Sequence, residues 1–192
     1  MRARAYGFLT ACVVLFVSTS VWSQDKKDDQ PGTLTVHIRD YCDPASFAAI
    51  GCTRAVTPVT SGIITFSGFQ AELTADKSVG AWRFIPDSAN TQEGVQLMLQ
   101  NLGGETHTFT RVKKFGGGFV PALNAASGNP TPAPECLKPP SADNVFVPAN
   151  SNVNGPQVRE GDTANFQCCI HPWMRTVINT KEHEQQDSGH DH

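Results

Sequence analysis

The stretch FQCCIHPWM, residues 166–174, places a thiol, an imidazole and a thioether within seven residues. One thiolate, two imidazoles and a long, weak thioether contact are the donor set of mononuclear copper sites that transfer electrons. The stretch supplies Cys168, His171 and Met174, so it lacks one imidazole. We therefore expect a second histidine ligand from a distant part of the chain.

His107 is the candidate for the missing ligand. Residues 94–101 alternate apolar and polar side chains, which predicts a half-buried strand. A glycine turn follows and presents His107 at the start of another expected strand, residues 108–112. A lone histidine in a turn is more often solvated, and a lone methionine such as Met174 more often fills a core. Their joint spacing with Cys168-x2-His171 favours a metal site.

The remaining chain indicates an all-β protein. Short segments rich in β-branched and aromatic residues recur between turn residues, and we find no internal repeat and no long amphipathic helix. This pattern predicts a Greek-key β-sandwich or barrel. Besides those already given, the expected strands are residues 33–38, 63–69, 82–85, 157–163 (a strand and turn), 164–168 and 177–178.

Residues 115–155 differ in character from the rest. They begin with the glycine run 116–118 and contain recurring prolines, which predicts a long insertion made of loop rather than packed helices or strands. The single cysteine of this segment, Cys136, indicates that a disulfide links the insertion to the rest of the domain. The whole predicted domain spans residues 33–180.

The two ends have the composition of export and tail segments. Residues 1–23 combine early arginines, an apolar run and small residues at a cleavage position, as a secretory signal peptide does. Cys12 is followed by more apolar residues, so a lipoprotein site is the less favoured alternative. We expect a flexible lead-in over residues 24–32 and a disordered, histidine-rich tail over residues 181–192, which is either merely solvated or metal-gathering.

The expected mature chain has an odd number of cysteines: Cys42, Cys52, Cys136, Cys168 and Cys169. If one of them is a metal-bound thiolate, four remain for two disulfides in an oxidising compartment; the alternative is one free or intermolecularly paired thiol. Cys42 and Cys52 bracket a short loop, and their spacing favours a local disulfide over a structural zinc pair.

Cys168 and Cys169 are adjacent, which raises the question of which one faces the metal. Neighbouring residues of an extended chain point to opposite sides. If Cys168 points into the site, Cys169 points away from it and is free to pair with Cys136. We therefore expect disulfides Cys42–Cys52 and Cys136–Cys169.

Three patterns in this chain resemble the cupredoxins, the small blue-copper proteins that include plastocyanin, pseudoazurin and amicyanin. Asn101 precedes His107 by five intervening residues, the turn at residues 160–163 leads into an aromatic-bearing strand, and residues 168–174 have the spacing Cys-x2-His-x2-Met. The ligand loop is most similar to that of amicyanin, including a proline after the histidine. The resemblance covers about residues 82–180 and excludes the Cys42 loop and the proline-rich insertion.

The resemblance implies one type 1 copper ion bound by His107, Cys168, His171 and Met174. It further implies that Asn101 and Thr108 support the ligands through hydrogen bonds. Thr108 stands where many members of the family have asparagine, and its hydroxyl is expected to take over that role. The C-x3-C pattern of two-copper centres is absent, and so is the usual glycine two residues after the methionine.

The resemblance also implies a function and a kind of partner. In such proteins the second histidine reaches the surface through an apolar patch, so we expect Pro172 and Trp173 to contact redox proteins in transient complexes. Packing of Trp173 over the ligand loop is the alternative. The expected function is that of an exported, periplasmic carrier of single electrons. A periplasmic copper-binding, trafficking or resistance protein is the alternative, on account of the histidine-rich tail and the long insertion.

Several other classes are disfavoured. The chain has 15 basic and 18 acidic side chains, whereas binding to nucleic acid calls for a basic patch. No apolar run after the leader approaches the ~20 residues of a membrane span. We also expect no enzyme, because neither a GxSxG nucleophile motif nor the further histidine clusters of a multicopper oxidase occur.

Overall fold

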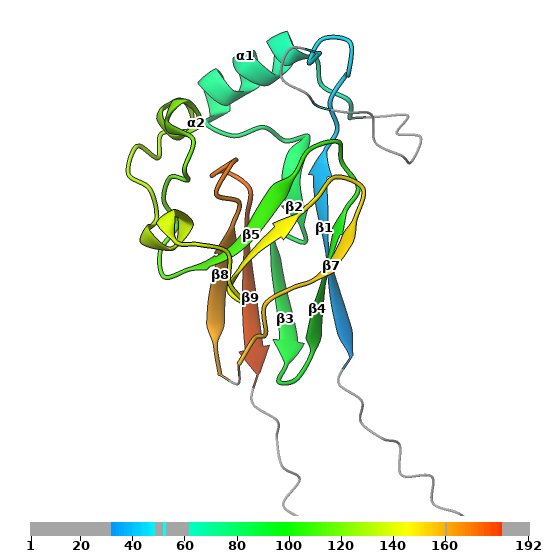
Figure 1. The fold of residues 1–192 in the computed structure, drawn as a ribbon, viewed down its shortest axis with the longest axis vertical. Helices are drawn as coiled ribbons and strands as arrows, with labels where there is room; N and C mark the ends of the chain where they lie inside the picture. The colour runs from blue at the N-terminus through cyan, green and yellow to red at the C-terminus, as the bar shows by residue number, and fades with distance from the viewer. Residues whose placement is uncertain (1–31, 49–51, 53–61, 160, 182–192) are drawn as a thin grey trace, which may run out of the picture. The chain divides into compact units, whose positions relative to one another are not determined.

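The computed structural model describes residues 32–48, 52, 62–159 and 161–181, and these described residues belong to one compact unit. Two sheets share one apolar core, with strand orders β2-β1-β4-β7 and β3-β9-β8-β5-β6 (Figure 1). The predicted all-β sandwich is confirmed. The strands are β1 (Thr33–Asp40), β2 (Trp82–Ile85), β3 (Ser88–Gln92), β4 (Gln96–Asn101), β5 (His107–Val112), β6 (Asn144–Val147), β7 (Asn152–Asn154), β8 (Thr163–Gln167) and β9 (Arg175–Lys181).

The first sheet is organised around β1, which alternates partly exposed and buried residues as a half-buried strand does. Val36, Ile38 and Asp40 are all fully buried. β1 runs antiparallel to β2 and parallel to β4, whose Leu97 and Leu99 are buried in the same core. Asp40 is therefore a carboxylate at a position where the alternation calls for an apolar side chain.

The second sheet is organised around β5, which lies between β8 and β6. β5 and β8 are antiparallel, with Thr110 opposite Gln167, so the start of β5 lies beside the end of β8. Phe109 stacks on Phe166 with ring centroids 4.5 Å apart and also contacts Phe84 of the other sheet at 5.2 Å. This register brings the beginning of β5 and the loop after β8 to the same end of the sandwich.

One expected strand is a helix. Residues 63–69 were predicted as strand, but only Ile64 makes a bridge, to Cys42, and α1 (Phe66–Asp76) follows. The Thr65 side chain accepts a hydrogen bond from the Gly68 N–H and so caps the first turn. The two buried side chains of α1, Phe69 and Leu73, are four residues apart, as on one face of a helix.

The prediction of an unstructured insertion at residues 115–155 is also wrong. This segment contains α2 (Pro121–Ala126) and the 3-10 helix η1 (Pro134–Leu137), and it supplies β6 to one sheet and β7 to the other. Pro121 and Pro134 open these helices, where the missing N–H of proline has no helical partner to lose. Prolines thus begin elements here instead of breaking them. The described residues between 157 and 162 do not form the expected strand either, and the next strand, β8, begins at Thr163.

Two disulfides are present, as expected. They join Cys42 to Cys52 and Cys136 to Cys169, and Cys168 is the free cysteine among the described residues. The predicted signal peptide and most of the lead-in and tail (residues 1–31 and 182–192) lie outside the described residues. In the part of the chain that the structure describes, no helix has the length and apolarity needed to cross a membrane.

Candidate metal centre

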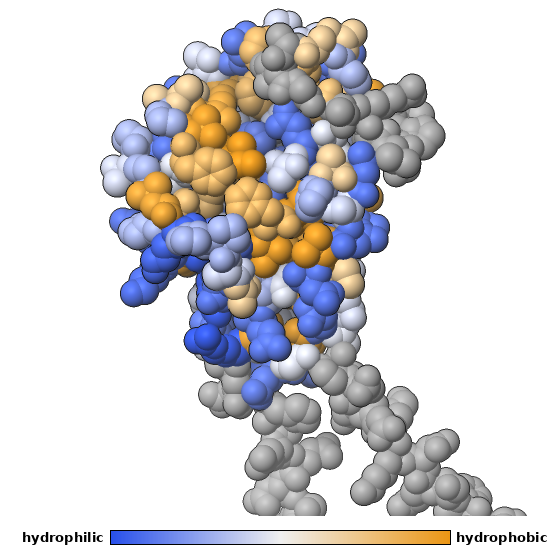
Figure 2. Space-filling view, viewed as in Figure 1, coloured by the Kyte–Doolittle hydropathy of each residue, from blue (hydrophilic) through white to orange (hydrophobic). Residues whose placement is uncertain are grey.

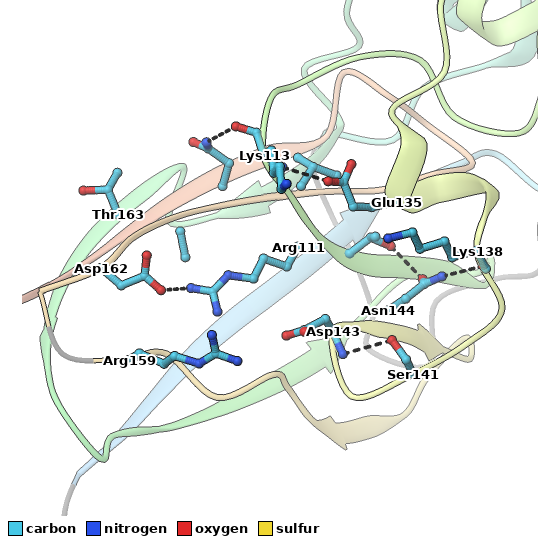
Figure 3. Close-up of a pocket in the computed structure, with 14 residues that line it drawn as sticks. Arg111, Lys113, Glu135, Lys138, Ser141, Asp143, Asn144, Arg159, Asp162 and Thr163 are labelled. Atoms are coloured by element: carbon cyan, nitrogen blue, oxygen red, sulfur yellow. Dashed lines mark hydrogen bonds and ion pairs between the residues drawn. The ribbon is translucent and has the colours of Figure 1, made fainter.

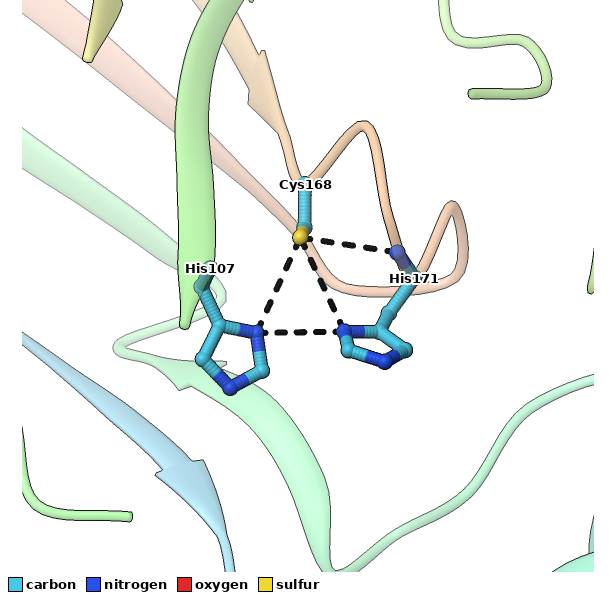
Figure 4. Close-up of side chains that lie close together, drawn as sticks. All are labelled: His107, Cys168 and His171. Atoms are coloured by element: carbon cyan, nitrogen blue, oxygen red, sulfur yellow. Dashed lines mark hydrogen bonds between the residues drawn. The ribbon is translucent and has the colours of Figure 1, made fainter. Parts of the chain in front are cut away.

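Three of the predicted ligands meet at the end of the sandwich (Figure 4). His107 begins β5, Cys168 follows directly after β8, and His171 lies in the next turn. The Cys168 Sγ atom is 3.7 Å from His107 Nδ1 and 3.8 Å from His171 Nδ1, and the two Nδ1 atoms are 3.2 Å apart. All three residues are buried. The structure thus brings together donors that are about sixty residues apart in sequence.

The spacing of these three atoms fits a bound metal ion. Metal–nitrogen distances of about 2.0 Å and metal–sulfur distances of about 2.3 Å place neighbouring ligand atoms roughly 3 to 4 Å apart. The observed separations fall in this range, and one thiolate with two imidazoles suits copper in both oxidation states. The cluster is therefore compatible with a copper site.

Met174 closes the loop that carries two of these ligands. Its N–H donates to the His171 carbonyl at 2.9 Å, and its carbonyl accepts from the Cys168 N–H at 3.0 Å. The Met174 side chain is fully buried in the same core cluster as Cys168. The loop of residues 168–174 is thus held at both ends by its own backbone, and Met174 remains a predicted ligand.

The surroundings of the Cys168 side chain favour its thiolate form, which is the form that binds metal. Burial alone raises the pKa of its thiol, but hydrogen bonds with His107 and His171 outweigh burial and bring the pKa well below its ordinary value. The backbone N–H groups of Thr108 and His171 also approach Sγ, at 3.4 and 3.5 Å. Because the thiolate is the metal-binding form of cysteine, the site is prepared to receive a cation.

Asp40 is the main functional candidate that the sequence did not reveal. It is fully buried, and its Oδ2 atom lies 3.0 Å from His107 Nε2. A histidine that donates its Nε2–H to a carboxylate keeps Nδ1 available for a metal, and Nδ1 is the atom that faces Cys168. Burial lowers the pKa of His107, but the hydrogen bonds with Asp40 and Cys168 raise it to about 10.

The loop after β4 anchors this carboxylate. Asp40 Oδ1 accepts the Gly104 N–H at 2.8 Å, and Oδ2 accepts the Glu105 N–H at 2.6 Å. A Cβ atom on Gly103 would lie 1.0 Å from Asp40 Oδ1. Only glycine at position 103 leaves room for the carboxylate. The signal available in the sequence was an acidic residue at an inward position of an alternating strand, because buried carboxylates require partners.

A second carboxylate stands behind the second histidine. Glu105 Oε2 is 3.5 Å from His171 Nε2, and burial raises the pKa of Glu105. Its other oxygen, Oε1, is buried and has no hydrogen-bond partner. Both imidazoles thus have a carboxylate on the side away from the thiolate, but the two carboxylates are held very differently.

The two residues expected to support the ligands contact the backbone around the site. The Asn101 amide donates to three carbonyls, those of Glu105 at 2.7 Å, Val147 at 3.1 Å and Pro148 at 3.0 Å. It therefore ties the loop that carries Glu105 to the end of β6. The Thr108 hydroxyl accepts the Cys169 N–H at 2.7 Å, which fixes the residue after the thiolate.

The expectation that His171 reaches the surface is wrong, since this residue is only 3 % exposed. Its ring contacts Trp82 with centroids 4.8 Å apart and Trp173 at 5.4 Å. Trp173 is half-buried and packs in turn on Phe69 of α1, at 5.8 Å. This is the packing role that the sequence left open as an alternative. Pro172 is buried as well.

Cys169 faces away from the metal centre. It lies in a second apolar cluster with Cys136, Val112 and Ala133, whereas Cys168 belongs to the main core. The adjacent cysteines therefore differ in role: Cys168 is a free cysteine beside two histidines, and Cys169 is half of a disulfide.

A cavity of about 540 Å³ lies elsewhere, beside β5 and β8 (Figure 3). Cations and carboxylates of similar number line it, and Arg111 forms an ion pair with Asp162. It contains none of the residues of the metal centre. The balanced charge offers no preference for an anion or a cation, and we assign it no function.

Comparisons with known proteins give a distant structural similarity. No family model matches the chain, and no curated protein matches it either. Among solved structures, the chain is similar to a purple cupredoxin from Nitrosopumilus maritimus, with 13% identity and a TM-score of 0.37; the match covers 56% of this chain and 92% of that one. The metal centre is therefore assigned on the geometry of His107, Cys168 and His171.

Proposed function

We propose that this protein is an exported type 1 copper protein that carries single electrons and is not an enzyme. The observation that carries the proposal is the cluster of one free, buried thiolate with two imidazole Nδ1 atoms, in a chain whose other described cysteines form disulfides. His107, Cys168 and His171 are the proposed equatorial ligands, and Met174 is the proposed weak fourth ligand.

For electron transfer, the protein would hold the ligand atoms in fixed positions. Bound copper would supply the change between Cu(I) and Cu(II). His107 is fixed by β5 and Asp40, Cys168 by the end of β8, and the loop of residues 168–174 by its closing hydrogen bonds. Ligands held by rigid elements and a supporting shell keep their geometry, which favours fast electron transfer.

The burial of the site favours a protein that keeps its copper over one that passes copper to a partner. The side chains of His107 and Cys168 are 0 % exposed and His171 is 3 % exposed, so a chelator has little direct access. The histidine-rich tail that motivates a trafficking role lies outside the described residues. We expect copper-loaded protein to keep its metal in the presence of a moderate excess of chelator; rapid loss of copper would favour the trafficking alternative.

We propose that transient protein partners meet the apolar face of the insertion and not the His171 edge. The Phe119 N–H donates to the Cys169 carbonyl at 2.8 Å, which links an exposed side chain to the residue next to Cys168. Figure 2 shows apolar side chains gathered on the face in view. The large apolar residues of the insertion that are exposed are Phe119, Leu137 and Phe146. Small transient interfaces of this kind suit redox complexes. Export to the periplasm is proposed from the leader and the disulfides.

The test is an optical and spin-resonance spectrum of the copper-loaded protein. We expect intense thiolate-to-Cu(II) charge-transfer absorption, which Cys168→Ser abolishes. Met174→Leu is expected to keep the colour and raise the reduction potential, because a weak donor to Cu(II) is lost. Met98→Leu in β4 is the matched control and should leave both unchanged. A colourless Cu(II) form, or colour that survives Cys168→Ser, contradicts the proposal.

A further inference from the structure

The insertion at residues 115–155 is fastened to both neighbours of Cys168. Neighbouring residues of an extended chain point to opposite sides, so Gln167 and Cys169 face away from the metal centre that Cys168 enters. Both are fully buried, and both contact the insertion, Gln167 through its amide and Cys169 through its disulfide. The insertion therefore holds the backbone on either side of the proposed thiolate ligand.

The Gln167 side chain uses both ends of its amide on the insertion. Its Oε1 atom accepts the Gly116 N–H at 3.0 Å. Its Nε2 group donates to the carbonyls of Gly116 at 3.2 Å and of Gly117 at 3.3 Å. Because Gln167 is buried, a side chain without an amide would leave these backbone groups without their partner, at a cost in stability.

Cys169 is held by the insertion in three ways. Its sulfur forms the disulfide with Cys136, and its carbonyl accepts the Phe119 N–H at 2.8 Å. A Cβ atom on Gly118 would lie 1.7 Å from the same carbonyl oxygen, so only glycine allows this close approach. The Asn124 side chain holds Gly118 in turn, since its Oδ1 accepts the Gly118 N–H at 2.7 Å and its Nδ2 donates to the Gly118 carbonyl at 2.8 Å.

These attachments lie where the sheet no longer supports the chain. The pairing of β8 with β5 and with β9 ends at Gln167, so Cys168 lies just beyond the ladder. On the other side of the site, His171 and Glu105 border a cavity of about 350 Å³ that is also lined by residues of α1 and α2. The position of the Cys168 backbone therefore depends on the hydrogen bonds of its own loop and on the insertion.

We propose that Gln167 is a positioning residue for the Cys168 ligand, because it fastens the insertion to the end of β8 and so fixes the direction of the Cys168 Sγ atom. The inference rests on the proposed copper function and extends it, since it gives the insertion a part in the metal centre. Loss of a group that orients a metal ligand typically costs about 10–100-fold in metal affinity. Gln167 acts through the backbone, so we expect an effect at the lower end of this range.

Gln167→Met tests the proposal, because methionine keeps the length of the side chain and removes its amide. We expect the copper-loaded variant to keep its thiolate-to-Cu(II) absorption at a shifted wavelength, with a changed copper hyperfine splitting in the spin-resonance spectrum. Its copper affinity should fall about tenfold. Gln100→Met, the same substitution on a half-buried residue of β4, is the matched control and should change neither spectrum nor affinity. A merely structural glutamine would lower the free energy of unfolding without moving the spectrum.

Gly118→Ala tests whether the effect runs through the insertion. The added methyl group would push the insertion away from the Cys169 carbonyl, so the spectrum should shift in this variant too. Gly32→Ala meets nothing within 4 Å and should not shift it. Since Gln167→Met and Gly118→Ala loosen the same contact, the double variant should show a smaller shift than the sum of the two single shifts.

A second measurement needs no copper. Cys168 is buried, so its alkylation by iodoacetamide in the metal-free protein, followed by peptide mass spectrometry, should be several-fold faster in Gln167→Met than in Gln100→Met. The proposal is overturned if these two variants match in both spectrum and alkylation rate. Should circular dichroism show that Gln167→Met does not fold, an unchanged spectrum and alkylation rate in Gly118→Ala overturn it instead. A wild-type protein without charge-transfer absorption contradicts the copper function, whereas the alkylation rate still decides whether Gln167 holds Cys168 in place.

Discussion

The two histidines of the metal centre are held in opposite ways. His107 lies on a strand, is fully buried, and is backed by Asp40, whose two oxygens accept two backbone N–H groups besides the imidazole. His171 lies in a loop and is backed by Glu105 at 3.5 Å, and one oxygen of that carboxylate has no partner. One side of the site is fixed from behind, and the other opens toward a cavity.

This difference follows from where each carboxylate sits. Asp40 belongs to a central strand, so it is held by the sheet as well as by the loop after β4. Glu105 belongs to that loop itself. A buried polar group with all its hydrogen bonds satisfied stiffens its surroundings, whereas one left partly unsatisfied does so less. We infer that the His107 side sets the geometry of the site.

Asp40→Asn tests the difference between the two histidines most directly, and we expect it to have the largest effect on stability and copper affinity. The amide group turns one acceptor into a donor, which then faces a backbone N–H or His107 Nε2–H. We expect the free energy of unfolding of the metal-free protein to fall by about 3–5 kcal/mol in urea titrations. Copper affinity should fall about 10–100-fold. Asp76→Asn, at the exposed end of α1, is the control and should cost less than about 0.5 kcal/mol.

Gly103→Ala displaces the Asp40 carboxylate without altering its chemical identity. The new methyl group would overlap Asp40 Oδ1, so the carboxylate has to move away from its backbone donors. We expect a loss of about 1–3 kcal/mol in the free energy of unfolding, as for other overpacked sites. Gly32→Ala meets nothing within 4 Å and should be nearly neutral. Equal effects of the two substitutions would show that Asp40 does not depend on this space.

The pH dependence of stability tests the His107 side in the metal-free protein. The pKa of His107 is raised from 6.5 to about 10, so its contribution is complete below pH 6.5 and is lost as the pH rises through about 10. The pKa of Cys168 is lowered from 9.0, so its contribution is complete above pH 9.0 and is lost as the pH falls through the folded-state pKa.

Between pH 6.5 and 9.0 these two slopes oppose one another, each at most about 1.4 kcal/mol per pH unit. We therefore expect the pair to give a plateau in that window, with stability falling on either side. Cys168→Ser removes one slope, and urea titrations across the window should then show stability that declines as the pH rises. A wild-type minus variant difference that does not increase with pH would contradict the thiolate–imidazolium pair.

Glu105→Gln should have the smallest effect on stability. The Glu105 oxygen nearest to His171 is 3.5 Å away, and the side chain is partly accessible, so the loss of charge costs little. We expect a change of less than about 1 kcal/mol in the free energy of unfolding, measured beside Asp40→Asn under the same conditions. An effect as large as that of Asp40→Asn would remove the contrast between the two sides of the site.

The sequence predicted the strands well where their residues alternate and poorly where polar residues or prolines dominate. β1 and β4 were predicted from the alternation of their residues, β2 from its strand-forming apolar residues, and β5 from the glycine turn that precedes it. β3 (Ser88–Gln92) was missed because its residues are polar and more or less exposed. α1 was taken in part for a strand, since its few apolar residues do not show the helical period strongly within a short window.

The three residues that meet at the candidate metal centre were also predicted from the chain: Cys168 and His171 from their local spacing, and His107 from the turn that precedes it. The residues behind them were not. Asp40 and Glu105 are single acidic residues far from Cys168 in sequence. The strand alternation places Asp40 on the inward side and so implies that it has a partner, but it does not identify His107 as that partner.

The sequence by itself determined the donor chemistry, because side-chain types and short spacings fix which atoms are available and which strands alternate. The tertiary structure decided the rest: the burial of His171, the carboxylate behind each imidazole, and the cavity beside them. These depend on strand register and on the packing of α1 and α2 against the end of the sandwich. Such contacts join residues distant in the chain, and no local pattern specifies them.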